Sequence, residues 1–110
     1  MIVLLFKSEL RKDLDKEQYQ AARARMMDLV QGIPGFISYK RFTAEDGETI
    51  AIARFNSKEA LESWRYHPEH VAVQRRGYDE FYESYWIEVC RVERDYGWSR
   101  KQGKLSARTK

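Results

Sequence analysis

The sequence contains few cysteines, prolines and glycines and has no long apolar run. Its single cysteine, Cys90, allows no internal disulfide, and two histidines are too few to complete a structural zinc site. Six glycines and two prolines in 110 residues exclude collagen-like and Pro/Gly-rich disordered chains. The apolar opening, residues 2–6, follows no basic region and is far shorter than the roughly 20 residues of a membrane helix. We therefore expect a cytoplasmic protein that does not associate with a membrane.

Charge is distributed unevenly along the chain. The formal net charge is +3, but residues 97–110 carry five basic side chains and no acidic one. Residues 1–96 hold 15 basic and 17 acidic side chains, so their net charge is −2. We therefore predict one globular domain over residues 1–96 and a basic, flexible C-terminal tail over residues 97–110. Because the domain itself is slightly acidic, we expect no nucleic-acid binding.

The rest of the chain has clear strand and helix patterns, in the order strand, helix, strand, strand, helix, strand. The predicted elements are a strand over 2–9, a helix over 14–31, strands over 35–43 and 49–55, a helix after residue 57 that breaks at His67-Pro68 and resumes to residue 78 or 81, and a strand over 82–93. This order predicts an α+β, ferredoxin-like split βαβ fold, in which a four-stranded antiparallel sheet carries helices on one face.

Local signals mark the ends of these elements. Asp13 or Asp15 can cap the first helix, Ser57 can cap the second, and His67 next to Pro68 is expected to cap the part that follows the break. Asp46-Gly47 supplies the positive φ that a hairpin turn needs between the two middle strands.

Several strands are apolar on both faces, notably residues 2–6 and 82–93. Helices cover only one face of a ferredoxin-like sheet, and soluble monomers avoid an apolar patch of the size left on the other. We therefore expect a homodimer that packs sheet against sheet into a dimeric α+β barrel. The alternative is that polar members of the strands make this face tolerable in water, namely Ser38, Lys40 and Glu88.

No Gly-rich phosphate loop, Cys-x-x-Cys pair, His-Glu-x-x-His or Gly-x-Ser-x-Gly motif is present. A nucleophilic pair of Cys90 with His67 or His70 can be written, but Cys90 has apolar neighbours in a strand and is expected to be an inert core thiol.

A group of aromatic and polar side chains follows the helix break. His70 and Gln74 lie one helical turn apart, with Tyr78 or Phe81 on the next turn. An imidazole and an amide on an aromatic wall are suited to a pocket for a flat organic ligand, and equally to a polar edge of the core.

The chain resembles the antibiotic biosynthesis monooxygenase (ABM) superfamily of dimeric α+β barrels over about residues 1–93. The segments that carry the resemblance are Ile33-Pro-Gly-Phe36, Ile50-Ala-Ile-Ala-Arg-Phe55, Ser57-Lys-Glu-Ala-Leu61 with Trp64, His67-Pro-Glu-His70, and the long strand from Tyr85 to Val92.

The resemblance implies a cofactor-independent monooxygenase that acts on a small aromatic or quinol-type substrate. His70 would deprotonate the substrate, Trp64 would pack against its ring, and Ser8 or Gln74 would hold its oxygen. The substrate-binding side chains implied in this way are Phe6, Gln74, Tyr78 and Phe81.

Two other functions remain open from the sequence. In the haem-degrading branch of the superfamily, Trp64 matches the tryptophan, but the asparagine position falls near Ser8 and the haem-ligating histidine falls near Gln74. An amide is a poor iron ligand, so we expect haem to bind weakly or not at all; the alternative is haem binding or degradation with His70 as a displaced ligand. The third possibility is a non-catalytic ligand-binding or structural dimer.

Overall fold

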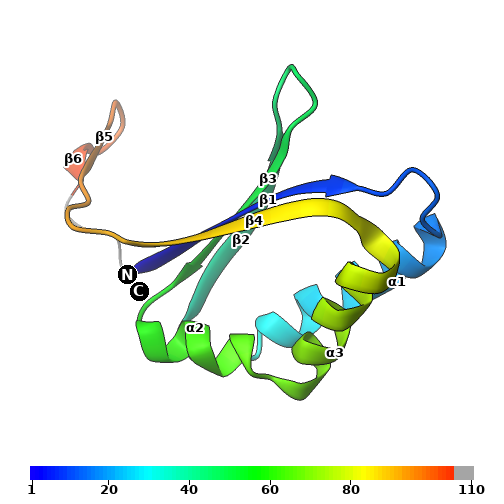
Figure 1. Ribbon diagram of the computed structural model, residues 1–110. Helices are drawn as coiled ribbons and strands as arrows, with labels where there is room; N and C mark the ends of the chain where they lie inside the picture. Colours follow the sequence, from blue (N-terminus) through cyan, green and yellow to red (C-terminus); the bar gives the residue numbers. More distant parts are fainter. Residues whose placement is uncertain (106–110) are drawn as a thin grey trace.

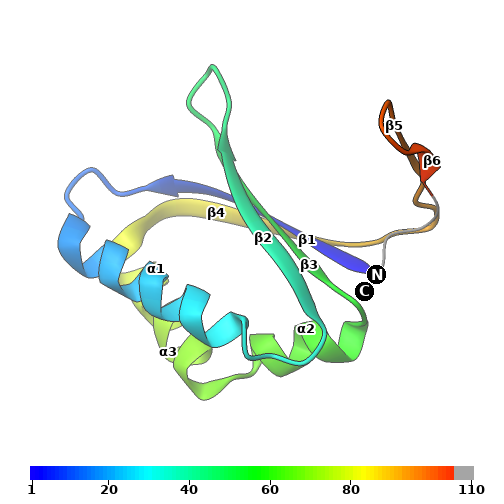
Figure 2. The ribbon, with the colours of Figure 1, turned by 180° about the vertical axis from the view of Figure 1, so that it is seen from behind.

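The computed structural model describes residues 1–105 and has a curved four-stranded antiparallel sheet with its helices on one side (Figures 1 and 2). The strand order is β2-β3-β1-β4. The strands are β1 (Ile2–Leu10), β2 (Phe36–Thr43), β3 (Thr49–Phe55) and β4 (Tyr82–Arg91), and the helices are α1 (Lys16–Val30), α2 (Lys58–Arg65), α3 (Pro68–Arg76) and the π-helical turn η1 (Gly77–Phe81). The predicted ferredoxin-like α+β fold is confirmed.

The helix boundaries follow the capping residues. Asp15 caps α1, where its carboxylate accepts a hydrogen bond from the Gln18 N–H at 3.1 Å. The Ser57 hydroxyl caps α2 by accepting from the Ala60 N–H at 3.1 Å. His67 caps α3 with Nδ1, which accepts from the Glu69 N–H at 3.2 Å. The capping roles predicted for Ser57 and His67 are confirmed, and Asp15 is the cap among the two aspartates considered.

Two glycines are required by the backbone. Gly47 has φ of 92° in the turn between β2 and β3, which confirms the predicted hairpin. Gly35, which leads into β2, has φ of 91°, and a Cβ there would lie 2.7 Å from the Ala60 Cβ and against the Asn56 side chain. The Ile33-Pro-Gly-Phe36 segment therefore lets the chain pass close beneath the start of α2.

The core consists of two clusters between the helices and the sheet. The larger cluster joins β1 and β3 to α1 and α2, and its buried members are Ile2, Val30, Ala53, Phe55, Ala60 and Leu61. The smaller one joins α1 to η1 and consists of Tyr19, Ala22 and Phe81. Phe55, only 1% exposed, is the most deeply buried large side chain among residues 1–105.

The other face of the sheet is not covered by any helix (Figures 1 and 2). The strand register places Val3, Leu5 and Ile52 on this open face, because their alternating neighbours point toward the core. Trp86 also lies on the open face, opposite Lys7, and is 66% exposed. The expectation of apolar residues on both faces is thus met.

The expectation that Cys90 is a core thiol is wrong, because its side chain is exposed. β4 is an edge strand, and its even-numbered residues point away from the helices.

The segment after β4 contains structure that the sequence patterns did not predict. Within the segment expected to be a flexible tail, β5 (Gly97–Ser99) and β6 (Gly103–Leu105) pair with each other as a small hairpin outside the main sheet. The remainder of the predicted tail, residues 106–110, lies outside the described residues. No helix within residues 1–105 is long and apolar enough to cross a membrane.

Candidate functional site

The histidine and tryptophan singled out in the sequence lie together where α2 meets α3. The His70 ring stacks on the Trp64 indole, with ring centroids 4.2 Å apart and planes inclined by 18°. The His70 Nδ1 lies 3.1 Å from the Trp64 carbonyl oxygen. A neutral imidazole that donates from Nδ1 to this carbonyl has its lone pair on Nε2. The break at His67-Pro68 turns the chain so that His70 folds back onto Trp64.

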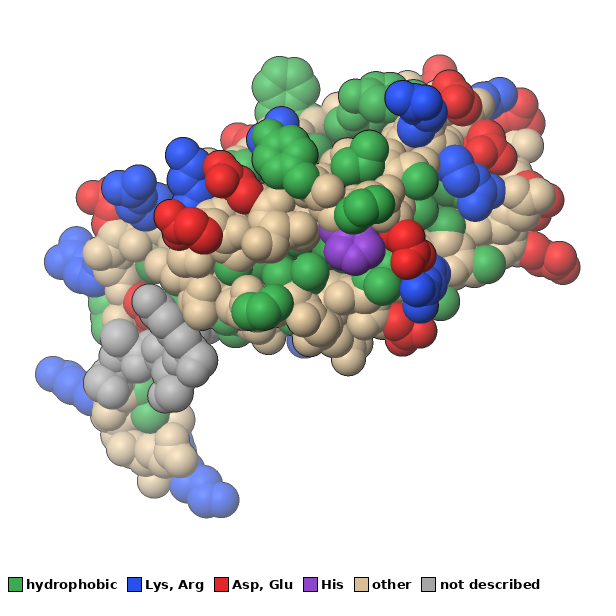
Figure 3. All heavy atoms as spheres, turned by 90° about the horizontal axis from the view of Figure 1, so that it is seen from below, with side chains coloured by type: hydrophobic (Ala, Val, Ile, Leu, Met, Phe, Trp, Pro, Cys, Tyr) green, Lys and Arg blue, Asp and Glu red, His purple; other side chains and the backbone are tan. Residues whose placement is uncertain are grey.

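The environment of His70 keeps its ring neutral. Burial lowers the pKa of His70 below its ordinary value of 6.5, although hydrogen bonding to the backbone at Trp64 and Arg65 partly opposes this shift. In a view from the helix side, hydrophobic side chains lie next to histidine, and acidic and basic side chains adjoin the same area (Figure 3). His70 therefore has the properties of a general base that is unprotonated at neutral pH.

A second group, composed of aromatic residues, lies at the other end of α3. Phe6 of β1 stacks on Tyr85 of β4 with ring centroids 5.5 Å apart and planes inclined by 14°. Tyr78 lies 5.6 Å from Tyr85, centroid to centroid, and Tyr82 closes the group at 5.5 Å from Phe6. The structure thus brings together the predicted Phe6 and Tyr78, but their common neighbour is Tyr85, which was not predicted to belong to the site.

The phenols of Tyr82 and Tyr85 are held in the protonated form. Burial, together with the neighbouring Tyr78 hydroxyl, raises the pKa of Tyr85 to about 12. Burial also raises the pKa of Tyr82, with a further contribution from Tyr19, while the charge of Arg41 acts in the opposite direction. These hydroxyls can therefore donate hydrogen bonds to a ligand oxygen at neutral pH.

Ser8 lies at the end of β1, on the same face of the sheet as Phe6, and pairs with Tyr85 of β4 and Thr49 of β3. It lines an open hollow of about 670 Å³ between the sheet end and the β2–β3 turn. The lining residues are Lys7, Ser8, Glu9, Asp46, Gly47, Glu48, Ser84, Tyr85 and Trp86. Ser8 is therefore associated with the aromatic group and not with the Trp64–His70 pair.

The remaining two predicted residues have different positions. Phe81 is 2% exposed in the smaller core cluster and packs edge-on against Tyr19, so its assignment as a substrate-binding side chain is corrected. The reason is that the helix widens into the π turn η1 after Arg76, which points Phe81 into the core and leaves Tyr78 69% exposed. Gln74 is exposed on α3, one turn after His70 and one turn before Tyr78.

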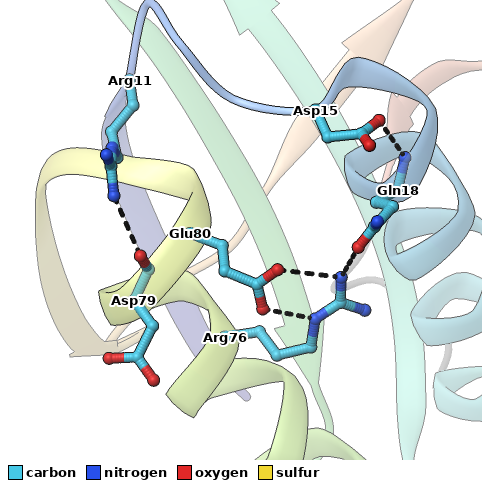
Figure 4. Close-up of polar contacts among 6 residues, drawn as sticks. All are labelled: Arg11, Asp15, Gln18, Arg76, Asp79 and Glu80. Atoms are coloured by element: carbon cyan, nitrogen blue, oxygen red, sulfur yellow. Dashed lines mark hydrogen bonds and ion pairs between the residues drawn. The ribbon is translucent and has the colours of Figure 1, made fainter.

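Polar contacts hold η1 in place (Figure 4). The Arg76 guanidinium pairs with Glu80 at 2.9 Å and donates to the Gln18 side chain of α1 at 2.6 Å. Arg11, which follows β1, donates to the Asp79 carbonyl at 2.9 Å. These contacts fix the turn that carries Tyr78 against both β1 and α1.

Part of β4 is uncovered on the helix side of the sheet. Ile87 and Val89 lie on the helix side of the sheet, opposite Phe6 and Leu4, yet they are 42% and 56% exposed. Within residues 1–105, no three His, Cys, Asp or Glu side chains gather closely enough to hold a metal ion. The helix side of the molecule thus carries a neutral base, phenol donors and exposed apolar surface on β4.

Comparison with known proteins supports a family assignment. The Bacillus subtilis protein YqjZ is 34% identical over 76 residues, which cover 69% of this chain and 67% of that protein. The structure of Rv0793 from Mycobacterium tuberculosis aligns with a TM-score of 0.70 at 18% identity, covering 83% of this chain and 93% of that one. SnoaB, a cofactor-independent oxygenase from Streptomyces nogalater, aligns with a TM-score of 0.67 at 10% identity, covering 84% and 93%.

Both structural similarities are below 25% identity and therefore support the fold alone. The sequence model of the antibiotic biosynthesis monooxygenase family matches residues 1–76, which contain β1 to α3 and the Trp64–His70 pair. On the strength of this match, the chain belongs to the antibiotic biosynthesis monooxygenase family.

Proposed function

We propose that this protein is a cofactor-independent monooxygenase of a small aromatic or quinol-type substrate. The observation that carries the proposal is the Trp64–His70 pair, in which a half-buried neutral imidazole is fixed by a backbone carbonyl and stacked on an indole. Such a base can take a proton from a phenol without a metal or cofactor. Membership of the antibiotic biosynthesis monooxygenase family adds support.

The proposed substrate lies along α3, over the exposed strip of Ile87 and Val89. Its reacting hydroxyl points to Nε2 of His70, while the phenol of Tyr78 or Tyr85 donates a hydrogen bond to an oxygen at the far end of the ring system. Apolar contacts with β4 hold the flat ring and exclude water from the anion. Gln74, which lies between the two ends on α3, is positioned to hold a polar substituent.

The proposed reaction needs only the substrate and oxygen. His70 removes the phenolic proton, and the electron-rich anion reduces O₂ and combines with it to form a C–O bond. The ring carbon then loses its hydrogen and water is released, so that a phenol and O₂ give a quinone and water. The protein contributes by forming and holding the anion, and the proton on His70 returns to the departing oxygen.

We propose that the active form is a homodimer joined through the open face of the sheet. Val3, Leu5 and Ile52 form an apolar area at the centre of this face, and Trp86 extends it at one edge. A second copy related by a two-fold axis would cover the same residues on both chains.

Oxygen uptake with a panel of phenols, naphthols and anthrones, without added metal or cofactor, tests the activity. We expect turnover to a quinone with one O₂ consumed per product, and a loss of at least a hundredfold in kcat/KM for His70→Ala. His67→Asn is the matched control, because it changes the other histidine but keeps a side chain that can cap α3. Equal activity of His70→Ala and His67→Asn would contradict the assigned base.

A further inference from the structure

The β5–β6 hairpin is an exposed basic and aromatic element that projects from the body of the protein (Figure 1). Tyr96 and Trp98 are 80% and 59% exposed, and the Arg100 guanidinium lies over the Trp98 ring at 5.1 Å. Lys101 and Lys104 are also exposed on the hairpin. Aromatic and arginine side chains in such positions are typical of residues that anchor protein interfaces.

The hollow at the opposite end of the sheet has the complementary character. Its lining includes the carboxylates of Glu9, Asp46 and Glu48, and the one basic residue in it, Lys7, already pairs with Glu88 at 3.3 Å. The exposed Trp86 indole supplies an apolar wall. With about 670 Å³ of open space, the hollow is large enough to receive aromatic side chains.

The hairpin and the hollow of one chain are at opposite ends of β1. Ile2 of β1 pairs with Arg91, where β4 leaves the sheet toward the hairpin, whereas Ser8 pairs with Thr49 next to the β2–β3 turn. The six residue steps from Ile2 to Ser8 span roughly 20 Å of strand. A hairpin that extends beyond Arg91 therefore points away from the hollow of its own chain.

We propose that the β5–β6 hairpin docks in the acidic hollow of a second copy of this chain. The proposal rests on the pairing of two copies through the open sheet face. A two-fold axis perpendicular to the strands reverses the second sheet and sets each hairpin beside the hollow of the other chain. The two contacts are then identical, so Arg100, Lys101 and Lys104 of one copy meet Glu9 and Glu48 of the other. Because Ser8 and Tyr85 line the same hollow, the hairpin also closes one end of the proposed substrate site.

Disulfide trapping between two different chains tests this docking without altering any charge. One chain carries Ser84→Cys in the hollow and the other carries Gln102→Cys in the hairpin, both in a Cys90→Ser background. We expect mild oxidation of the mixture to give a cross-linked pair in at least tenfold higher yield than Gln102→Cys mixed with Ser63→Cys, which places the thiol on α2. A yield no higher than this control in a sample that sedimentation shows to be dimeric would overturn the docking and leave the dimer intact.

Charge reversal tests the electrostatic part of the interaction. Glu9→Lys with Glu48→Lys in the hollow, or Lys101→Glu with Lys104→Glu in the hairpin, should each lower the cross-linking yield at least tenfold at low salt. Reversal on both sides should restore it. Asp46 stays unchanged, because its carboxylate accepts a hydrogen bond from the Glu48 N–H at 2.9 Å.

Three outcomes would contradict the proposal in different ways. Cross-linking yields that stay the same after either charge reversal would contradict docking through charge complementarity. A disulfide formed within a single chain that carries both Ser84→Cys and Gln102→Cys would mean that the hairpin folds back on its own body. A chain that stays monomeric at all concentrations and forms no cross-link would overturn both the docking and the homodimer.

Discussion

At the scale of single residues, His70 is the residue whose chemistry depends most on its surroundings. Its pKa is lowered by burial, so the neutral form needed for a base persists below pH 6.5. We expect kcat/KM to be constant from pH 7.5 down past 6.5 and to fall tenfold per pH unit only below the pKa of His70. A pH–rate profile checks this, and a limb centred above pH 6.5 would contradict it.

The same shift affects stability. Because the unfolded chain binds a proton at His70 more readily than the folded chain, protonation favours unfolding below pH 6.5. The free energy of unfolding of the wild type should therefore exceed that of His70→Gln by more at pH 7.5 than at pH 5.5. The variant loses the same packing at both pH values, but it has no imidazole to protonate at the lower one. Urea unfolding at the two pH values checks this.

Trp64 has both a packing and a candidate functional role. It packs partly against the core cluster that contains Ala60 and Leu61, so Trp64→Ala would remove packing that is typically worth about 3 to 5 kcal/mol. Trp64→Phe keeps an aromatic ring under His70 but removes the indole N–H. If Trp64 only packs, this variant should keep its turnover of a phenolic substrate. A hundredfold loss in a folded, dimeric variant, about 2.7 kcal/mol of transition-state stabilisation, would indicate a direct role.

Gly35 is the residue whose replacement the backbone tolerates least. A non-glycine residue held at positive φ typically costs roughly 1 to 3 kcal/mol of stability. Gly35→Ala should cost more than this, because its Cβ would also meet Ala60. Urea unfolding measures the loss. Gly47→Ala is a useful control, since its φ of 92° matches that of Gly35 but no atom outside its chain neighbours lies within 4 Å of a Cβ built there.

At the scale of elements, the joint between α2 and α3 controls the candidate site. His67 caps α3 through Nδ1, and Pro68 occupies the first turn. His67→Ala should cost about 1 kcal/mol and lower the affinity for ligand, because α3 and His70 move with the cap; His67→Asn should retain most of both. Chemical unfolding and ligand titration of the two variants check this. Equal losses would indicate that the cap does not set the position of His70.

The sequence predicted most elements because they follow simple periodic patterns. The strand and helix order was correct, and caps such as Ser57 and His67 bond within their own first turn, so local sequence determines them. The Trp64–His70 pair follows from the Pro68 break in the same way.

Other features depend on contacts between distant parts of the chain. The π turn that buries Phe81 is held by Arg76 and by Arg11, which is 68 residues from its partner Asp79. Tyr85 joins the site only because β4 pairs with β1, and no local pattern distinguishes it from the other tyrosines of β4. The β5–β6 hairpin is too short and polar to give a periodic signal, although Gly97 and Gly103 are compatible with a turn.

At the scale of the whole molecule, the open sheet face determines how copies associate. Leu5→Lys places a charge at the centre of this face without touching the helix-side core, and it should weaken dimerisation at least thirtyfold, about 2 kcal/mol. Sedimentation equilibrium at micromolar concentration measures the effect, with Glu59→Lys on α2 as a surface control. A wild-type chain that sediments as a 13.1 kDa monomer would contradict the dimer.

The pairing of β1 with β4 has a consequence for how the protein is made. Ile2 pairs with Arg91, which is synthesised 89 residues later. Until then β1 has only β3 beside it, and the aromatic group around Phe6 lacks Tyr82 and Tyr85. Contacts so distant in sequence form slowly, so the apolar first strand lacks one of its two neighbours while the residues between β1 and β4 are synthesised. We therefore expect the sheet and the candidate site to be completed in the same late step, after β4 has been synthesised.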